Sequence, residues 1–211
     1  MKIGCVVMAA GNSVRFGRNK LLAQYEGRPL IQLALQAVPA ELFSRVAVVT
    51  QYPEVESLAR SFRFQVVSNP HPEAGQSLSV RLGLARMLDC DAVLFQVADQ
   101  PRLRRSDVEG LLAFYESHPD HIVALGHQGH RGNPCLFPAR FFPELLEIEG
   151  DQGGSSVIRA HESDLLLWEV PTAALMDVDT PQQLHRLMDA LKALDAKQLD
   201  ALVNLAEQMK R

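Results

Sequence analysis

The feature that most constrains the fold is a regular alternation of short apolar runs with amphipathic helical patterns. The apolar runs are rich in β-branched residues, which favours buried strands, and the segments between them have helical spacing. The expected strands are Ile3–Met8, Arg45–Thr50, Gln65–Ser68, Ala92–Ala98 and Ile122–Leu125, and the expected helices are Pro29–Ala37, Glu54–Phe62, Ser77–Leu88 and Ser106–Ser117. This order predicts a three-layer α/β/α, Rossmann-like fold with a mixed, mostly parallel sheet.

The pattern loosens beyond the fifth expected strand. Residues 127–138, HQGHRGNPCLFP, are rich in Gly and Pro and are interpreted as a functional loop or an edge insertion. A further strand is expected at Asp164–Val170. A helix is expected at Pro181–Leu194, with Asp179 or Thr180 as its N-cap and the proline in its first turn.

Length and composition are those of one globular domain. The chain has 211 residues, 47% apolar and 22% charged, with a net charge of −4 and no dense Lys/Arg run, which argues against a general nucleic-acid surface. No apolar run is long enough to span a membrane. The three cysteines include no CxxC pair, which predicts a reduced, cytoplasmic setting, and Cys135 is interpreted as a partly buried thiol. We expect a domain over residues 1–193 and a C-terminal amphipathic helix over 194–211 that covers the core or a partner subunit.

The loop that follows the first expected strand, Ala9–Lys20, reads AAGNSVRFGRNK. Gly11 permits a sharp turn and a close approach to a ligand, and free backbone N–H groups in such a loop form an anion-binding nest. Arg15, Arg18 and Lys20 add charge that suits phosphate. The spacing matches neither G-x-x-x-x-G-K-[ST] nor G-x-G-x-x-G. The alternative to a phosphate site is a solvated basic turn.

Two acidic segments are candidate metal ligands. Asp99 ends the strand that precedes Pro101, a position from which a carboxylate can hold Mg²⁺, although an Asp-x-Pro turn alone would also explain it. Asp179 and Asp177 precede the expected helix at Pro181, where Asp179 is either a second metal ligand or an N-cap. Taken with the basic loop, the two carboxylates favour a site for a metal and a triphosphate.

Two further segments carry polar groups that suit a ligand. Ser77 and Ser79 stand at the start of an expected helix, where unpaired N–H groups attract anions, although plain capping is compatible with the same pattern. His127, His130 and Arg131 are suited to an acidic substrate. No third ligand follows at a spacing typical of zinc, so we do not expect a structural zinc site.

Together these segments resemble the MobA-like nucleotidyltransferases, a branch of the nucleotide-diphospho-sugar transferase (glycosyltransferase-A-like) fold. The matching elements occur in the family's order and are AAGNSVRFGRNKLL (9–22), NPHPEAGQSLSVRLGL (69–84), ADQP (98–101), GHRGNPCLF (129–137) and DVDTP (177–181). The first element is most similar to that of the molybdenum cofactor cytidylyltransferases, because Ala10 stands where guanylyl relatives usually carry a glycine. The family often has G-D-K-G-A-R where this chain has GDQGGS (150–155), and Arg159 is a candidate replacement for the missing lysine.

The resemblance implies a Mg²⁺-dependent reaction in which the terminal phosphate of molybdopterin attacks the α-phosphate of CTP. The products would be molybdopterin cytosine dinucleotide and pyrophosphate. A phosphate monoester has a second pKa of about 6 and is already anionic at neutral pH, so no strong general base is required. Catalysis would depend on positioning and charge neutralisation.

The roles that the resemblance assigns fall into four groups. The catalytic residues are Arg15, Lys20 and Asp99. The nucleotide-binding residues are Ala9, Ala10, Gly11, Arg15, Lys20, Ser77, Ser79 and Asp99. The metal ligands are Asp99 and Asp179. The acceptor-binding residues are His130, Arg131, Gly132, Asn133 and Pro134.

Alternative functions share the same fold. One is a guanylyltransferase, or a nucleotidyltransferase that acts on a sugar or polyol phosphate. Another is a non-catalytic nucleotide-binding chaperone for cofactor insertion, which need not retain both carboxylates. The resemblance further implies a molybdenum hydroxylase as recipient of the product, no nucleic-acid or membrane partner, and a monomer or weak homodimer.

Overall fold

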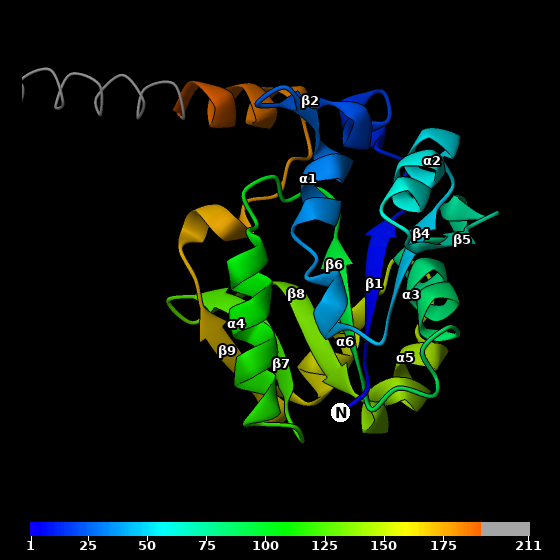
Figure 1. The fold of residues 1–211 in the computed structure, drawn as a ribbon, viewed down its shortest axis with the longest axis vertical. Coiled ribbons are helices and arrows are strands. Elements are labelled where there is room, and N and C mark those ends of the chain that lie inside the picture. Colours follow the sequence, from blue (N-terminus) through cyan, green and yellow to red (C-terminus); the bar gives the residue numbers. More distant parts are fainter. Residues whose placement is uncertain (191–211) are drawn as a thin grey trace, which may run out of the picture.

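The computed structural model describes residues 1–190 and consists of a central sheet with helices on both faces (Figure 1). The strands are β1 (Ile3–Ala9), β4 (Arg45–Thr50), β5 (Gln65–Ser68), β6 (Ala92–Val97), β7 (Ile122–His127), β8 (His130–Pro138) and β9 (Leu165–Glu169). The helices are α1 (Leu30–Gln36), α2 (Pro53–Ser61), α3 (Gln76–Leu84), α4 (Arg105–Glu116), α5 (Phe142–Glu147) and α6 (Gly154–Ala160). A small separate hairpin pairs β2 (Gln24–Tyr25) with β3 (Arg28–Pro29).

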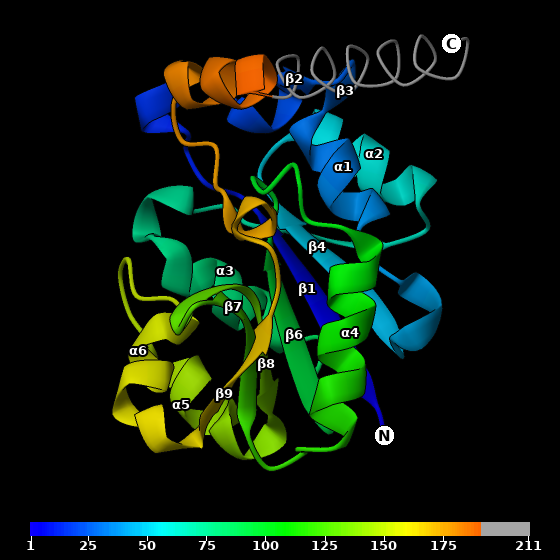
Figure 2. The same cartoon turned by 90° about the vertical axis from the view of Figure 1, so that its left-hand side faces the viewer.

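The sheet has the strand order β5-β4-β1-β6-β8-β7-β9. Parallel pairs join β1 to β4 and β6, β4 to β5, and β7 to β9, whereas β8 is antiparallel to both of its neighbours. Figure 2 shows the sheet between α1, α2 and α4 on one side and α3, α5 and α6 on the other. The predicted three-layer fold with a mixed, mostly parallel sheet is therefore confirmed.

Alternating side chains of the strands supply the two layers of the core. On β1, Cys5 and Val7 pack under α1, α2 and α4, whereas Val6 packs under α3 and α5, and all three are fully buried. Gly83 of α3 lies so close to Val6 that an added Cβ atom would stand 2.4 Å from its Cγ1 atom. The period of two along the strand thus fixes which helices lie on which face.

The interpretation of residues 127–138 as a loop or edge insertion was wrong. These residues turn at Gln128–Gly129 and form β8, which lies between β6 and β7 inside the sheet. The pairing between β7 and β8 is interrupted between Ala124 and Gly126, and Pro134 falls in this irregular stretch. Because proline cannot donate to a strand ladder, it is tolerated where regular pairing is broken. The Gly/Pro composition therefore marks a bulged strand.

The C-terminal elements were predicted in part. β9 confirms the expected strand, and residues 181–190 are helical, as expected. Thr180 is the cap, since its Oγ1 atom accepts a hydrogen bond from the Gln183 backbone N–H at 3.2 Å. The end of the helix expected at Pro181–Leu194, the boundary at 193 and the helix over 194–211 fall outside the described residues. α3 ends at Leu84 rather than at Leu88, and no helix in the described part is long and apolar enough to cross a membrane.

Candidate active site

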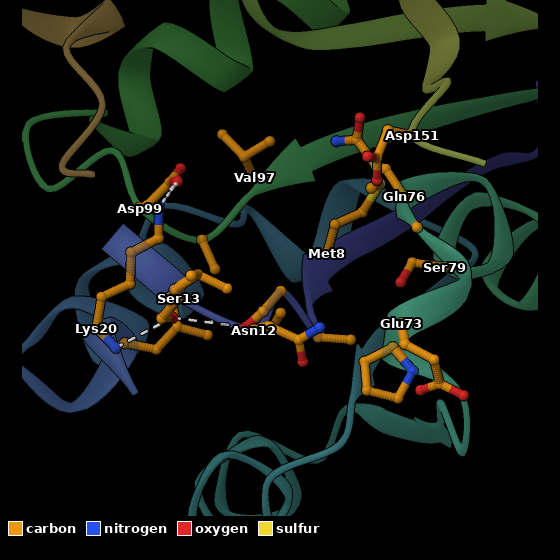
Figure 3. A pocket seen from close by; sticks show the side chains of 18 residues that line it. Met8, Asn12, Ser13, Lys20, Glu73, Gln76, Ser79, Val97, Asp99 and Asp151 are labelled. Atoms are coloured by element: carbon orange, nitrogen blue, oxygen red, sulfur yellow. Dashed lines mark hydrogen bonds and ion pairs between the residues drawn. The ribbon is translucent and has the colours of Figure 1, made fainter. Parts of the chain in front are cut away.

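The candidate site lies where the order of the parallel strands reverses. β1 pairs with β4 on one side and β6 on the other, and the loops after β1 and β6 leave the sheet at the same edge. Such switch points are where open α/β sheets bind ligands. A cleft of about 480 Å³ opens there, lined by the loop after β1, the start of α3, the end of β6 and Asp151. Figure 3 shows these side chains around the cleft.

The loop after β1 is held from outside the cleft by two residues that follow β4. Gln51 Nε2 donates a hydrogen bond to the Ala10 carbonyl at 2.9 Å, and the Tyr52 hydroxyl donates to the Gly11 carbonyl at 2.8 Å. Within the described residues, the backbone N–H groups of Gly11, Asn12 and Ser13 have no hydrogen-bond acceptor. These three consecutive residues line the cleft. The loop therefore presents three consecutive unpaired donors at the cleft, as an anion-binding nest would require, and anion binding there stays a prediction.

Lys20 connects this loop to the two predicted carboxylates. Its Nζ atom lies 2.6 Å from Asp99 Oδ2 and 2.9 Å from Asp179 Oδ1, and its side chain is only 15% exposed. Arg15 pairs with the other oxygen of Asp179 at 2.9 Å, although its side chain is 71% exposed and does not line the cleft. Val178 adds a backbone tie, because its N–H donates to the Asp99 carbonyl at 2.9 Å. Residues predicted from three distant segments thus meet in one cluster.

The charges in this cluster set one another's protonation states. Burial alone would lower the pKa of Lys20, but the two aspartates outweigh it and raise the pKa above its ordinary value. Burial alone would raise the pKa of Asp179, but Lys20 and Arg15 outweigh it and hold the pKa below its ordinary value. Burial, and then the charge of Asp99, raise the pKa of Asp177 to about 6. At neutral pH, Lys20 is therefore protonated and Asp179 ionised.

The carboxylates are suited to a divalent cation that has further ligands from outside the protein. Asp99 Oδ1 is buried and has no hydrogen-bond partner among residues 1–190, so one strong acceptor lacks a donor or cation. The described residues contain no group of three or more His, Cys, Asp or Glu side chains that could hold a metal. Mg²⁺ is typically bound by one or two carboxylates plus substrate phosphates and water, which is the chemistry that Asp99 and Asp179 offer.

The start of α3 forms the opposite wall of the cleft, but not with both predicted serines. Ser79 lines the cleft, and its Oγ atom accepts a hydrogen bond from Asn69 Nδ2 at 3.0 Å. Ser77 does not line it, because the side chain turns into the protein and is 1% exposed. Gly75 and Gln76 take that place, and Gly75 has φ = 89° and no room for a Cβ atom beside the Gly150 carbonyl. The prediction for the Ser77 side chain was therefore wrong.

Four of the five predicted acceptor residues lie in a second cleft of about 340 Å³. His130, Arg131, Gly132 and Asn133 line it together with Asp177, whereas Pro134 is buried and does not. A smaller cavity is lined by residues of both clefts: Met8 and Gln76 from the first, and Arg131, Asn133 and Ser155 from the second. The two clefts are therefore neighbours, as a transfer between two substrates requires.

Side chains around the second cleft clarify several sequence interpretations. Arg131 donates a hydrogen bond to Ser155 Oγ at 2.9 Å, which fixes its guanidinium group at the cleft wall. The His127 ring is hydrogen-bonded through Nδ1 to the Val170 carbonyl at 2.8 Å. Burial raises the pKa of the Cys135 thiol, which agrees with an inert buried cysteine. Arg159 is exposed on α6 and lines none of these cavities, so it does not replace the missing lysine.

Three functional residues were missed by the sequence analysis. Gln51 and Tyr52 follow the carboxyl end of β4, so the rule that ligands gather at strand ends would have found them. Asp151 lines the nucleotide-side cleft from a turn between α5 and α6 and lies opposite Lys20 in Figure 3. The only signal for it was its place in GDQGGS (150–155), the segment that departs from the family's G-D-K-G-A-R.

Comparison with known proteins agrees with this geometry. Residues 5–165 match the MobA-like NTP transferase domain family. The chain is 26% identical over 199 residues to the purine catabolism protein PucB of Bacillus subtilis (strain 168), covering 88% of this chain and 96% of that protein. It is 30% identical over 192 residues to a probable molybdenum cofactor guanylyltransferase of Nostoc sp. (strain PCC 7120), and the alignment covers 85% of this chain and 87% of that protein.

Among solved structures, the fold is similar to that of Rv0371c from Mycobacterium tuberculosis H37Rv. The TM-score is 0.75 at 22% identity, and the alignment covers 90% of this chain and 98% of the other. A structure of the same M. tuberculosis protein in complex with manganese gives a TM-score of 0.73. This similarity supports the fold.

The hydrogen bond from Tyr52 to Gly11 provides a test of the anion nest. Replacing Tyr52 by Phe removes one hydroxyl that holds the loop, so the affinity for inorganic pyrophosphate should fall about 2- to 12-fold, the equivalent of one neutral hydrogen bond. Isothermal titration calorimetry measures this change. Tyr115→Phe is the matched control. Tyr115 lies on α4, away from the cleft, and its hydroxyl donates a similar hydrogen bond to the Pro119 carbonyl. Equal affinities for Tyr52→Phe and wild type would show that the nest does not bind the anion.

Proposed function

We propose that this chain, which belongs to the MobA-like NTP transferase domain family and is therefore a nucleotidyltransferase, transfers CMP from CTP to the terminal phosphate of molybdopterin. The products are molybdopterin cytosine dinucleotide and pyrophosphate. Family membership favours an enzyme over a non-catalytic chaperone. The observation that carries the proposal is the contact of Lys20 with Asp99 and Asp179, beside the unpaired N–H groups of the loop after β1 and near the cleft lined by four of the predicted acceptor residues.

In the proposed reaction, the triphosphate lies against the nest formed by Gly11, Asn12 and Ser13. Three N–H groups that have no other acceptor can bind phosphate oxygens there without reorganisation. Lys20 stands at the same end of the cleft and is positioned to neutralise the charge that builds up on the departing pyrophosphate. Arg15 is close enough to add a second positive charge from the cleft rim.

Asp99 and Asp179 are the proposed ligands of Mg²⁺. When bound, the metal would supply positive charge that reduces repulsion between the nucleotide and the incoming acceptor phosphate. The unpartnered Asp99 Oδ1 atom supports this role, and a solved protein of the same fold has been crystallised with manganese. Both carboxylates pair with Lys20; Asp99 lines the cleft, and Asp179 reaches Lys20 without lining the cleft itself.

The acceptor is proposed to occupy the cleft lined by His130, Arg131, Gly132 and Asn133. Arg131 is oriented by Ser155 and can form forked contacts to an acceptor phosphate. That phosphate is already anionic at neutral pH, so the residues need to orient it rather than deprotonate it.

Three further points remain predictions from the resemblance. They are a molybdenum hydroxylase as recipient of the product, a monomeric or weakly dimeric state, and a cytoplasmic location.

The choice of CTP depends on Ala10. This residue is 4% exposed, lines the cleft and adds a methyl group where guanylyl relatives usually carry a glycine. Glu73 and Asp151 lie at the end of the cleft away from Lys20 (Figure 3), but both cytosine and guanine present N–H donors that a carboxylate can accept. The guanylyl reaction is the second candidate, because a relative that is 30% identical carries that name.

Pyrophosphate release tests the choice of substrates. Wild-type protein is incubated with Mg²⁺, molybdopterin and each of the four ribonucleoside triphosphates in turn. CTP should give a rate at least about tenfold above that with GTP, because the Ala10 methyl group discriminates by shape. Release with GTP only would reverse the base choice. Release that requires a sugar phosphate in place of molybdopterin would contradict the acceptor.

Variants at the charged cluster test the proposed roles. Lys20→Ala and Asp99→Ala should each lower the turnover with CTP by about 10²- to 10³-fold, because each removes a group that acts on developing charge. Circular dichroism should show an unchanged fold. Lys2→Ala and Asp89→Ala are matched controls, since these residues form a similar pair at 2.7 Å, exposed and remote from the cleft. Near wild-type turnover of either cluster variant would contradict the assignment.

A further inference from the structure

A separate cleft of about 360 Å³ lies on the other side of the segment that carries Asp99. It is enclosed by the β2–β3 hairpin, the end of α1 and residues 101–105, which lead into α4. None of its lining residues belongs to the nucleotide cleft. We call it the basic cleft, because Arg28, Arg102, Arg104 and Arg105 line it against a single acidic residue, Glu26.

Two of the four arginines are already neutralised and two are not. Arg28 pairs with Glu26 at 3.6 Å, and Arg105 pairs with Glu41 and with Glu109. Arg102 and Arg104 form no ion pair with any acidic side chain in the part of the chain that the structure describes. Positive charges gathered in one recess repel one another, and a bound anion relieves that repulsion.

One residue that lines the basic cleft, Tyr25, carries a buried hydrogen-bond donor that has no acceptor among residues 1–190. Tyr25 is 2% exposed, and its ring packs in an apolar cluster with Leu30 and Leu184. Its hydroxyl group is buried and has no partner among residues 1–190. Burial raises the pKa of Tyr25, and the positive charge of Arg102, which lines the same cleft, opposes that rise. A buried hydroxyl without a partner is costly unless a ligand completes its bonding.

We propose that the basic cleft binds the phosphate group of a small molecule. Arg102 and Arg104 would form charge-assisted contacts with the phosphate oxygens, and the buried Tyr25 hydroxyl would donate a hydrogen bond. The start of α4 at Arg105 adds the positive end of a helix dipole. A recessed donor favours a small phosphate over an acidic protein segment, whose carboxylates would meet the arginines at the rim without reaching Tyr25.

This site is placed to influence the nucleotide cleft. Arg102 lies on the segment that begins at Asp99, and the Leu103 N–H donates to the Gln100 carbonyl in a turn at 3.3 Å. A phosphate that holds Arg102 would therefore restrict the segment from which the Asp99 carboxylate projects. The proposal concerns a binding site distinct from that of the transfer reaction and does not depend on the identity of the transferred base.

The site can be tested by NMR on the full chain labelled with ¹⁵N and titrated with inorganic phosphate. The backbone amide signals of residues 25–28 and 102–105 should shift and saturate. The combined Arg102→Gln and Arg104→Gln changes should weaken this binding by about tenfold or more, because two charge-assisted contacts are lost. Tyr25→Phe should weaken it severalfold without lowering the melting temperature, because the hydroxyl that it removes has no partner in the protein. Signals of residues 10–15 report the nucleotide cleft separately and should respond as in wild type.

Controls and added ligands decide between outcomes. Arg60→Gln, an exposed arginine paired with Glu56 on α2, should leave phosphate binding unchanged. Pyrophosphate and CTP, titrated in turn, show whether a free phosphate or a nucleotide is the better ligand. Saturation of the signals of residues 25–28 and 102–105 by either ligand supports the proposal. The proposal would be overturned if sodium chloride at equal ionic strength produced the same shifts as phosphate. It would also be overturned if the signals saturated only with a poly-glutamate peptide. Shifts confined to residues 10–15 would overturn it as well.

Discussion

The structure of the site depends on one ammonium group held between two carboxylates. Lys20 is 79 residues from Asp99 and 159 residues from Asp179 in the sequence, yet its Nζ atom is within hydrogen-bond distance of both. Three carboxylates gather there once Asp177 is counted, and a cation is needed to offset their repulsion. The Lys20 ammonium group supplies that positive charge. The pair of contacts also fastens the C-terminal segment across the edge of the sheet.

That fastening explains why residues beyond the family match take part in the site. The match ends at residue 165, but Asp179 lies in the segment that returns over the loop after β1. Val178 is 1% exposed and packs with Phe16 and Leu184, while its backbone N–H binds the Asp99 carbonyl. Apolar packing therefore brings the second carboxylate to Lys20, and Thr180 caps the following helix. Asp179 is left free for charge interactions.

The sequence predicted the fold and the charged cluster because both depend on local pattern. Strand-end rules placed the loop after β1 and Asp99 at one edge, and this was sufficient to bring Lys20 to Asp99. β8 was missed because its glycines and prolines mask a strand whose pairing is interrupted at Pro134. The direction of the Ser77 side chain was also beyond reach, since one step along a helix turns a residue from cleft to core. Tyr52 was missed because its place just after the carboxyl end of β4 is its only signal.

The central claim is that a nucleotide and a divalent metal share the cleft between the nest and the two carboxylates. A crystal structure with Mg²⁺ and α,β-methylene-CTP, which cannot be cleaved, tests it most directly. The account predicts phosphate oxygens on the N–H groups of Gly11, Asn12 and Ser13, and a metal bound by the carboxylates of Asp99 and Asp179. A nucleotide bound elsewhere, or a triphosphate in this cleft with no metal contact to either carboxylate, would contradict it.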